Sequence, residues 1–190
     1  MEKVTKYLWI TFCVIALTKL LLAFLVASPT IFSDEYFYAK MGESIAETGS
    51  LAVHGEKTNA YPPLYPLLIS PAYSVNDMSV SYILIKLMNV LVSTAIVFPV
   101  FFFAKEFVDK KKAYTISAIV SVMPLSFSLS PYIMSENLFY PLVMTTVYMM
   151  FRSLTENKLR WSILTGIFIG LSILTKVVGL ILIPIYATAV

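Results

Sequence analysis

Long apolar stretches separated by short polar connections dominate the chain. Four of them approach the roughly 20 residues that an α-helix needs to cross a bilayer. They cover about residues 7–28, 80–104, 113–131 and 136–151. Two shorter apolar stretches, about 161–175 and 177–190, flank Lys176. The pattern predicts an all-α integral membrane protein with about six transmembrane helices, organised as one module over residues 1–190.

One long polar connection, the loop over about residues 29–79, separates the first two spans. Ser33 is a good N-cap for a helix from Asp34 to about Thr48, which Gly49 would end. Its mixed apolar and acidic faces are typical of a helix that lies in the membrane interface. The stretch from Tyr61 to Val75 is apolar, but four prolines break it and it is too short to cross, so we expect it to pack along the membrane surface or dip into it.

Composition supports the membrane class. Hydrophobic residues make up 58% of the chain and charged residues 13%, which leaves too little polar surface to coat a soluble globule. The single cysteine, Cys13, excludes an internal disulfide and a cysteine-based metal cluster. There is no basic tail and no aromatic-basic patch, so nucleic acid is not an expected partner.

Charge is distributed unequally between alternate connections. One side receives most of the lysines and arginines: Lys3, Lys6, Lys105, Lys110, Lys111, Lys112, Arg152, Lys158 and Arg160. The other side receives the acidic loop and Glu136. The positive-inside rule therefore predicts a protein of the cell membrane with a cytoplasmic N-terminus and an outer acidic loop.

Three carboxylates are candidates for chemistry on the outer side. Asp34 and Glu35 fall in the first turn of the loop helix, and Glu136 opens the fourth span. Acids at these positions also complement the helix dipole for stability alone, and that alternative stays open. An ionised Glu136 close to lipid is nevertheless costly unless it is paired or faces a wet cavity.

Lysines inside the apolar segments are candidates for anion binding. A helix continuing through Lys176 for about 30 residues would be about 45 Å long, so we expect the chain to turn there. A lysine beside a helix N-terminus favours a phosphate at Lys176, with snorkelling to the surface as the alternative, whereas for Lys86 the two interpretations are equally open. Lys19 lies near the middle of the first span and has no obvious partner. Gly166 and Gly170 form a GxxxG pair that predicts close helix packing.

Five motifs in order resemble the GT-C membrane glycosyltransferases, in particular the polyprenyl-phosphate-mannose protein mannosyltransferases and the lipid A aminoarabinose transferases. They are SDEYFY from Ser33, YPPLYP from Tyr61, Lys86 with Asn89, SENLFYPL from Ser135 and GLSILTKVVGL from Gly170. The resemblance implies transfer of a sugar from a polyprenyl phosphate in the bilayer to an acceptor hydroxyl of a protein, glycan or lipid, with inversion.

The resemblance also implies roles for particular residues. Asp34 would be the base, with Glu35 beside it, and Lys176 and Lys86 would hold the donor phosphate. Glu136 and Tyr38 would contact the acceptor or a metal. A divalent cation, Mg or Mn, would be held by Asp34 and Glu136 if one is used at all.

The chain departs from its relatives in two respects. Tyr61 stands where they often carry Lys or His, which removes a phosphate or metal contact from that motif. Many relatives also continue for several more spans, so the chain reads as a truncated module or a very small member. A non-catalytic module that binds a polyprenyl-linked lipid or a partner protein is the alternative function, whereas the charge distribution disfavours a transporter.

Overall fold

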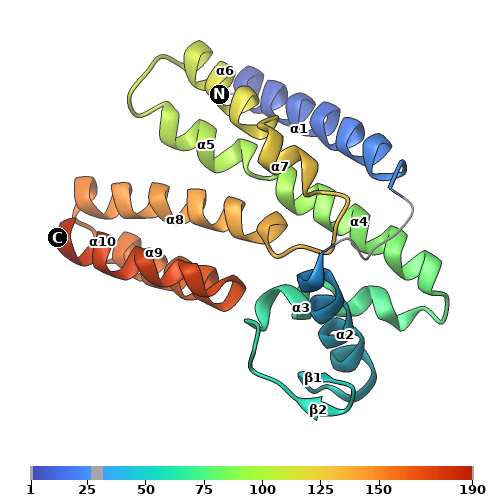
Figure 1. The fold of residues 1–190 in the computed structure, drawn as a ribbon. Coiled ribbons are helices and arrows are strands. Elements are labelled where there is room, and N and C mark those ends of the chain that lie inside the picture. The colour runs from blue at the N-terminus through green and yellow to red at the C-terminus, as the bar shows by residue number, and fades with distance from the viewer. Residues whose placement is uncertain (1, 27–31, 190) are drawn as a thin grey trace.

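The computed structural model describes residues 2–26 and 32–189. The last residues of the expected first span (27–28), the first of the expected outer loop (29–31) and residue 190 lie outside the described residues. The described part is helical apart from a two-stranded antiparallel hairpin (Figure 1). In chain order the elements are α1 (Glu2–Ala23), α2 (Ser33–Thr48), β1 (Ala52–Val53), β2 (Glu56–Lys57), α3 (Leu64–Ile69), the 3₁₀ helix η1 (Ser70–Ser74), α4 (Met78–Thr94), α5 (Val97–Ala104), α6 (Lys110–Ser121), α7 (Pro124–Ser128), α8 (Glu136–Glu156), α9 (Leu159–Thr175), the 3₁₀ helix η2 (Val177–Ile181) and α10 (Leu182–Ala189).

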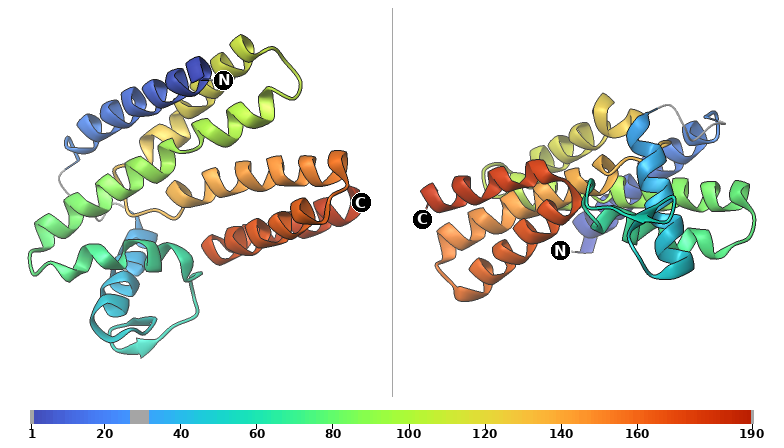
Figure 2. Two further views of the ribbon diagram at one scale, coloured as in Figure 1. Left: turned by 180° about the vertical axis from the view of Figure 1, so that it is seen from behind. Right: turned by 60° about the horizontal axis from the view of Figure 1, so that its bottom comes forward.

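The longer helices form a bundle, and α2, α3 and the hairpin form a smaller lobe at one end of it (Figures 1 and 2). Helix α8 packs against α9, and η2 and α10 return along α9. Helix α1 lies beside α4 and α6. We call the end that carries the lobe the lobe end, and the end that carries the N-terminus and the α8–α9 turn the basic end.

The membrane-spanning prediction is confirmed only in part. Within residues 2–26 and 32–189, two helical segments are both long and apolar enough to cross a bilayer, Thr5–Ala23 and Met78–Ala104. Shorter apolar helices cover Leu159–Thr175 and Val177–Ala189. The expectation of about six spans is not confirmed, because Pro124 divides the stretch at 113–131 into the short helices α6 and α7.

The lobe is held by an aromatic and aliphatic core between α2, α3 and α4. Tyr38, Tyr65, Ile69 and Ile85 are buried in it. Gly49 ends α2 in the left-handed conformation at φ 70°, as predicted. Ser33 is the first residue of α2 rather than its cap, since the residue before it has the extended backbone. The stretch after Tyr61 forms only short helices, which pack on α2.

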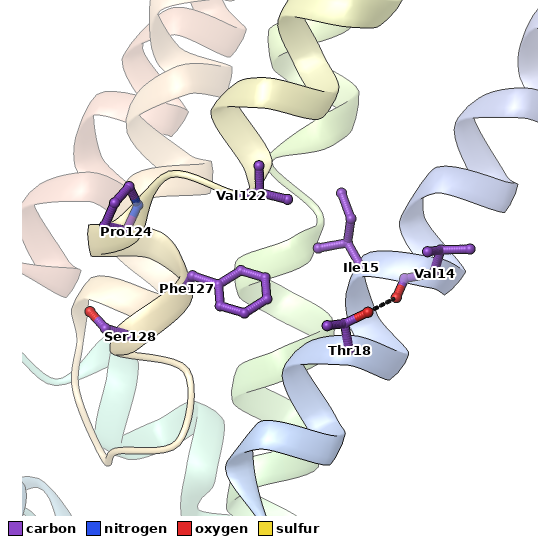
Figure 3. A pocket seen from close by; sticks show the side chains of 7 residues that line it. All are labelled: Val14, Ile15, Thr18, Val122, Pro124, Phe127 and Ser128. Carbon is purple, nitrogen blue, oxygen red and sulfur yellow. Dashed lines mark hydrogen bonds between the residues drawn. The ribbon is translucent and has the colours of Figure 1, made fainter.

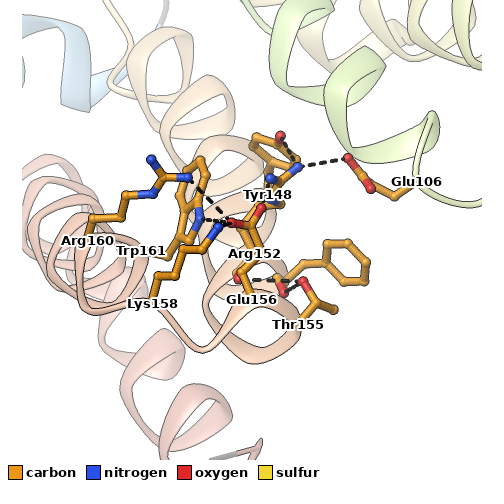
Figure 4. Close-up of polar contacts among 9 residues, drawn as sticks. Glu106, Tyr148, Arg152, Thr155, Glu156, Lys158, Arg160 and Trp161 are labelled. Carbon is orange, nitrogen blue, oxygen red and sulfur yellow. Dashed lines mark hydrogen bonds and ion pairs between the residues drawn. The ribbon is translucent and has the colours of Figure 1, made fainter.

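A cluster of charged side chains closes the basic end (Figure 4). Arg152 of α8 pairs with Glu106, after α5, at 3.2 Å and with Glu156 one turn further along α8. Glu156 also accepts hydrogen bonds from three groups that follow α8, on Lys158, Arg160 and Trp161. The cluster therefore connects the α5–α6 loop to the turn between α8 and α9.

The predicted glycine contact lies elsewhere. A methyl group built on Gly166 or Gly170 would meet nothing within 4 Å in the described residues, so this pair does not bring two helices together there. Gly179 of η2 does lie at a close approach, because an added Cβ would be 2.8 Å from the backbone carbon of Ser172. The expectation of close packing at Gly166 and Gly170 is therefore corrected to Gly179.

Candidate functional site

Asp34 lies half-buried in the first turn of α2, where the lobe meets the bundle. Its Oδ1 atom accepts a hydrogen bond of 2.9 Å from the Tyr61 hydroxyl. The proline after Tyr61 favours an extended backbone there, and the Tyr61 ring stacks on Phe37 with centroids 5.1 Å apart. One oxygen of the Asp34 carboxylate is therefore held by a neutral donor in a fixed orientation.

The Glu35 carboxylate is buried and binds backbone amides. The side chain is 0% exposed. Oε1 accepts a 2.8 Å hydrogen bond from the Ile133 amide, and Oε2 accepts one of 3.2 Å from the Phe32 amide. The carboxylate thus caps the start of α2 and attaches it to the segment before α8.

Tyr38 lies between the two acidic positions. Its hydroxyl donates to Ser135 Oγ at 2.9 Å, and its ring meets those of Tyr61 and Tyr65 edge-on at 5.1 and 5.2 Å. Burial is the main cause that raises the pKa of Tyr38 to about 12, and the nearby carboxylates of Glu136 and Asp34 act in the same direction. Tyr38 therefore stays neutral at physiological pH and acts as a hydrogen-bond donor.

Lys176 and Glu136 form an ion pair across the lobe end of the bundle. Lys176 directly follows α9 and Glu136 lies in the first turn of α8, so antiparallel packing of the two helices brings them together. The chain turns at Lys176, as predicted. The element after it is the short 3₁₀ helix η2 rather than an α-helix, so Glu136 rather than a helix N-terminus is the partner of the ammonium group.

Lys86 is not brought to this ion pair by any contact among the described residues. Its Nζ atom donates to the carbonyl oxygen of Ala23 at 2.9 Å and to that of Val26, and it lies 4.2 Å from the centre of the Tyr82 ring. Lys86 therefore satisfies carbonyls at the end of α1, where the helix dipole favours a cation. Lys86 is buried rather than snorkelling to the surface, and its expected contact with the donor phosphate stays a prediction.

The remaining contacts join Asp34 to Lys176 in one continuous series. Asp34 binds Tyr61, whose ring touches Tyr38, and Tyr38 donates to Ser135. The Ser135 hydroxyl lies 3.4 Å from Glu136 Oε2, and Glu136 pairs with Lys176. A carboxylate that can accept a proton and an ammonium group that can bind an anion are thus connected through three neutral side chains, with a ring contact between Tyr61 and Tyr38 and hydrogen bonds elsewhere.

The donor set does not fit the divalent cation. Among the described residues, no group of three or more His, Cys, Asp or Glu side chains could hold a metal. Glu136 is already paired with Lys176, and an ammonium group beside a carboxylate opposes a second cation. Asp34 and Glu136 therefore do not form a site for a divalent cation among the described residues.

Two members of the series were missed as site residues. Tyr61 looked like a departure from the family pattern, yet it is the partner of Asp34. Ser135 stood in the SENLFYPL motif without a role, and its hydroxyl connects Tyr38 to Glu136. The sequence did contain a signal for both residues, because Tyr61 lies in the YPPLYP motif and Ser135 in the SENLFYPL motif.

The structure also provides the missing partners of Lys19. Its side chain is 0% exposed, and Nζ donates to Ser93 Oγ at 3.0 Å and to Ser126 Oγ at 3.2 Å. Since α1 ends at Ala23, Lys19 lies about 6 Å from the end of the helix rather than near its middle. Two hydroxyl groups from α4 and α7 thus solvate this ammonium group in the bundle.

Comparison with known proteins gives one match. The sequence profile of the dolichyl-phosphate-mannose-protein mannosyltransferase family matches residues 60–190, well over half of the chain. The matched part contains Tyr61, Ser135, Glu136 and Lys176, whereas Asp34 precedes it. A search of curated proteins gave no significant match. The extent of the profile match shows that the chain belongs to the dolichyl-phosphate-mannose-protein mannosyltransferase family, whose members are membrane glycosyltransferases.

Proposed function

We propose that the protein moves a sugar from a polyprenyl-phosphate donor to an acceptor hydroxyl of a protein, glycan or lipid at the outer membrane face, with inversion at the anomeric carbon. Family membership supports the reaction class. The observation that carries the assignment to these residues is the series of contacts from Asp34 to the Glu136–Lys176 pair.

Asp34 is the proposed base. The acceptor oxygen attacks the anomeric carbon, its proton passes to Asp34 Oδ2, and the bond between the sugar and the phosphate oxygen breaks. The hydrogen bond from Tyr61 to Oδ1 orients the carboxylate. The product is a glycoside with inverted configuration, and polyprenyl phosphate leaves with the bonding electrons.

Lys176 is the proposed contact for the leaving phosphate. Phosphate is a weak base, so its departure needs charge stabilisation more than it needs a general acid. An incoming phosphate would compete with Glu136 for the ammonium group, and the Ser135 hydroxyl could then take over part of the solvation of Glu136. Glu35 and Lys86 are assigned here to holding α2 and α1 in place.

The proposed setting is a multi-pass cell-membrane protein with its N-terminus in the cytoplasm and the lobe outside. The ends of the bundle support this orientation. The basic residues of the loops after α5 and α8 lie at one end, and the lobe with Asp34 lies at the other (Figure 1).

Replacing Asp34 by Asn tests the base assignment. The variant keeps an acceptor oxygen for Tyr61 but cannot take a proton, so we expect at least a hundredfold loss of donor turnover. The protein is expressed in membranes and supplied with radiolabelled polyprenyl-phosphate mannose or the corresponding aminoarabinose donor. Release of polyprenyl phosphate and transfer of label are both measured.

Glu47→Gln is the matched control, because Glu47 is an exposed acid on the same helix. It should retain full turnover. Retained turnover in Asp34→Asn would remove Asp34 as the base. Donor binding without transfer by the unmodified protein would instead favour the non-catalytic lipid-binding module.

A further inference from the structure

A groove runs along the outside of the bundle between α1 and the α6–α7 segment, away from the site described above. It consists of three adjoining hollows of about 480, 380 and 420 Å³. The first and second share Val14, Ile15 and Val122, and the second and third share Tyr114. We refer to the whole as the α1–α6 groove.

The walls of the groove are almost entirely apolar. Figure 3 shows the hollow nearest the lobe end, where the Phe127 ring points from α7 towards Ile15 and Thr18 of α1. The Thr18 hydroxyl, which could have been a polar contact, donates to the Val14 carbonyl of its own helix. A hydrogen bond between Thr11 and Tyr114 joins the two helices further along. Such a groove suits a hydrocarbon chain.

The mouth of the groove at the basic end is positively charged. Lys110 and Lys111 line it together with Tyr7 and Tyr114. Both lysines are exposed, and within the described part of the chain neither forms an ion pair, in contrast to Lys112, which pairs with Asp109. Two free ammonium groups beside two tyrosines at the edge of an apolar groove favour a ligand with an anionic head and an apolar tail.

The length of the groove identifies the kind of tail. Its lining on α1 extends from Tyr7 to Thr18, which corresponds to about 16 Å of helix. Half of a hydrocarbon core is about 15 Å thick. One acyl chain of a single leaflet therefore fills the groove, whereas a polyprenyl chain is much longer than the groove.

We propose that the α1–α6 groove binds an anionic phospholipid of the bilayer, with one acyl chain along α1 and its phosphate between Lys110 and Lys111. This lipid is a bound structural or regulatory ligand and not the sugar donor, whose proposed phosphate contact, Lys176, pairs with Glu136 at the start of α8, whereas Lys110 and Lys111 start α6. The inference does not depend on the proposed transfer reaction.

Photo-crosslinking in nanodiscs tests the inference. The intact protein is reconstituted with phosphatidylglycerol that carries a diazirine in one acyl chain, or with phosphatidylcholine that carries the same chain, and adducts are mapped by mass spectrometry. Each lysine beside an anionic headgroup contributes a factor of roughly five, so we expect roughly 25-fold more labelling of groove residues by phosphatidylglycerol. Lys110→Ala/Lys111→Ala should reduce labelling to the phosphatidylcholine level.

Two further variants separate a defined site from general attraction. Lys105→Ala/Lys158→Ala removes the same charge from the same end but outside the groove, and it should keep the preference. Ala118→Trp fills the groove and should reduce labelling by both lipids. Equal labelling by the two lipids would overturn the proposal, as would equal losses in both lysine pairs. Displacement of phosphatidylglycerol by equimolar polyprenyl phosphate, or adducts confined to other surfaces, would overturn it too.

Discussion

At the scale of single residues, the structure separates side chains that look equivalent in the sequence. Asp34 and Glu35 are neighbours in one helical turn, yet Asp34 is half-buried beside a phenol while Glu35 is enclosed by two backbone amides. Lys86 and Lys176 differ in the same way, because one binds carbonyl groups and the other a carboxylate. The candidate chemistry therefore concentrates on Asp34 and Lys176.

Tyr38 gives a pH prediction at this scale. Its pKa in the folded protein is about 12, against an ordinary value of 10. The folded state thus holds the phenolic proton more tightly, so the contribution to stability is complete below pH 10 and is lost as pH rises from 10 to 12. Tyr38→Phe has no phenolic proton, so we expect it to lack this pH-dependent contribution to the free energy of unfolding, which is on the order of 2 kcal/mol.

The measurement is the free energy of unfolding in detergent across pH 9 to 12. The difference between the unmodified protein and Tyr38→Phe should shrink as pH rises through this range. A difference that stays constant with pH would show that Tyr38 titrates normally.

Features of the site that depend on residues close in sequence could be predicted, whereas contacts between residues far apart in sequence could not. The position of Asp34 and Glu35 in a first helical turn follows from local helix rules and was confirmed. The partner of Glu35 lies 98 residues away and that of Lys176 lies 40 residues away. Such contacts depend on which helices pack together, and a single sequence does not specify that packing.

At the scale of the elements, hydrophobic length was a good guide to where helices lie and a poor guide to where they break. The stretches at 80–104 and 161–175 are helical much as expected, with a change from α4 to α5 at Ala95–Ile96. The stretch at 113–131 instead breaks before Pro124. Proline lacks the amide that the helix needs, but apolar composition hides its effect.

The approach of η2 to α9 gives a prediction for Gly179. An added methyl group would lie 2.8 to 2.9 Å from three backbone atoms of Ser172 and Ile173. Backbone atoms cannot move as a flexible side chain can, so Gly179→Ala should cost about 1–3 kcal/mol through overpacking. The expected readout is a lower Tm in detergent.

Gly170→Ala, in helix α9, is the control for Gly179→Ala. The space around Gly170 is open in the described residues, and alanine favours a helix over glycine by up to about 1 kcal/mol. The variant should match or exceed the unmodified Tm. If Gly170→Ala lowered the Tm more than Gly179→Ala did, the packing described for α9 and η2 would be wrong.

At the scale of the whole molecule, the lobe and the charged cluster of the α8–α9 turn lie at opposite ends of the bundle. The lobe with Asp34 lies at one end, and the cluster around Arg152 and Glu156 lies at the other (Figures 1 and 4). This arrangement agrees with the orientation proposed from the loop charges, in which the basic loops face the cytoplasm and the lobe faces outward. The orientation can be tested directly.

The test places a single cysteine at each end after Cys13→Ser removes the only natural one. Asn59→Cys lies in an exposed part of the lobe and Leu159→Cys at the exposed start of α9. An impermeant maleimide added to intact cells should label position 59 and reach position 159 only after lysis. Labelling in the opposite order would reverse the proposed orientation and move the site to the cytoplasmic face.

The contacts between α1 and α4 have a consequence for the biogenesis of the protein. The ammonium group of Lys19 binds Ser93 of α4 and Ser126 of α7, and the carbonyl group of Ala23 at the end of α1 binds Lys86 of α4. Helix α4 is therefore the first later helix that contributes to both polar requirements of α1. In lipid, each unmet polar group would cost several kcal/mol. Helix α1 should therefore be retained at the insertion machinery until α4 has been synthesised, and the two helices should enter the bilayer as a pair. The lobe, whose sequence lies between them, would then begin to fold with both of its ends already anchored.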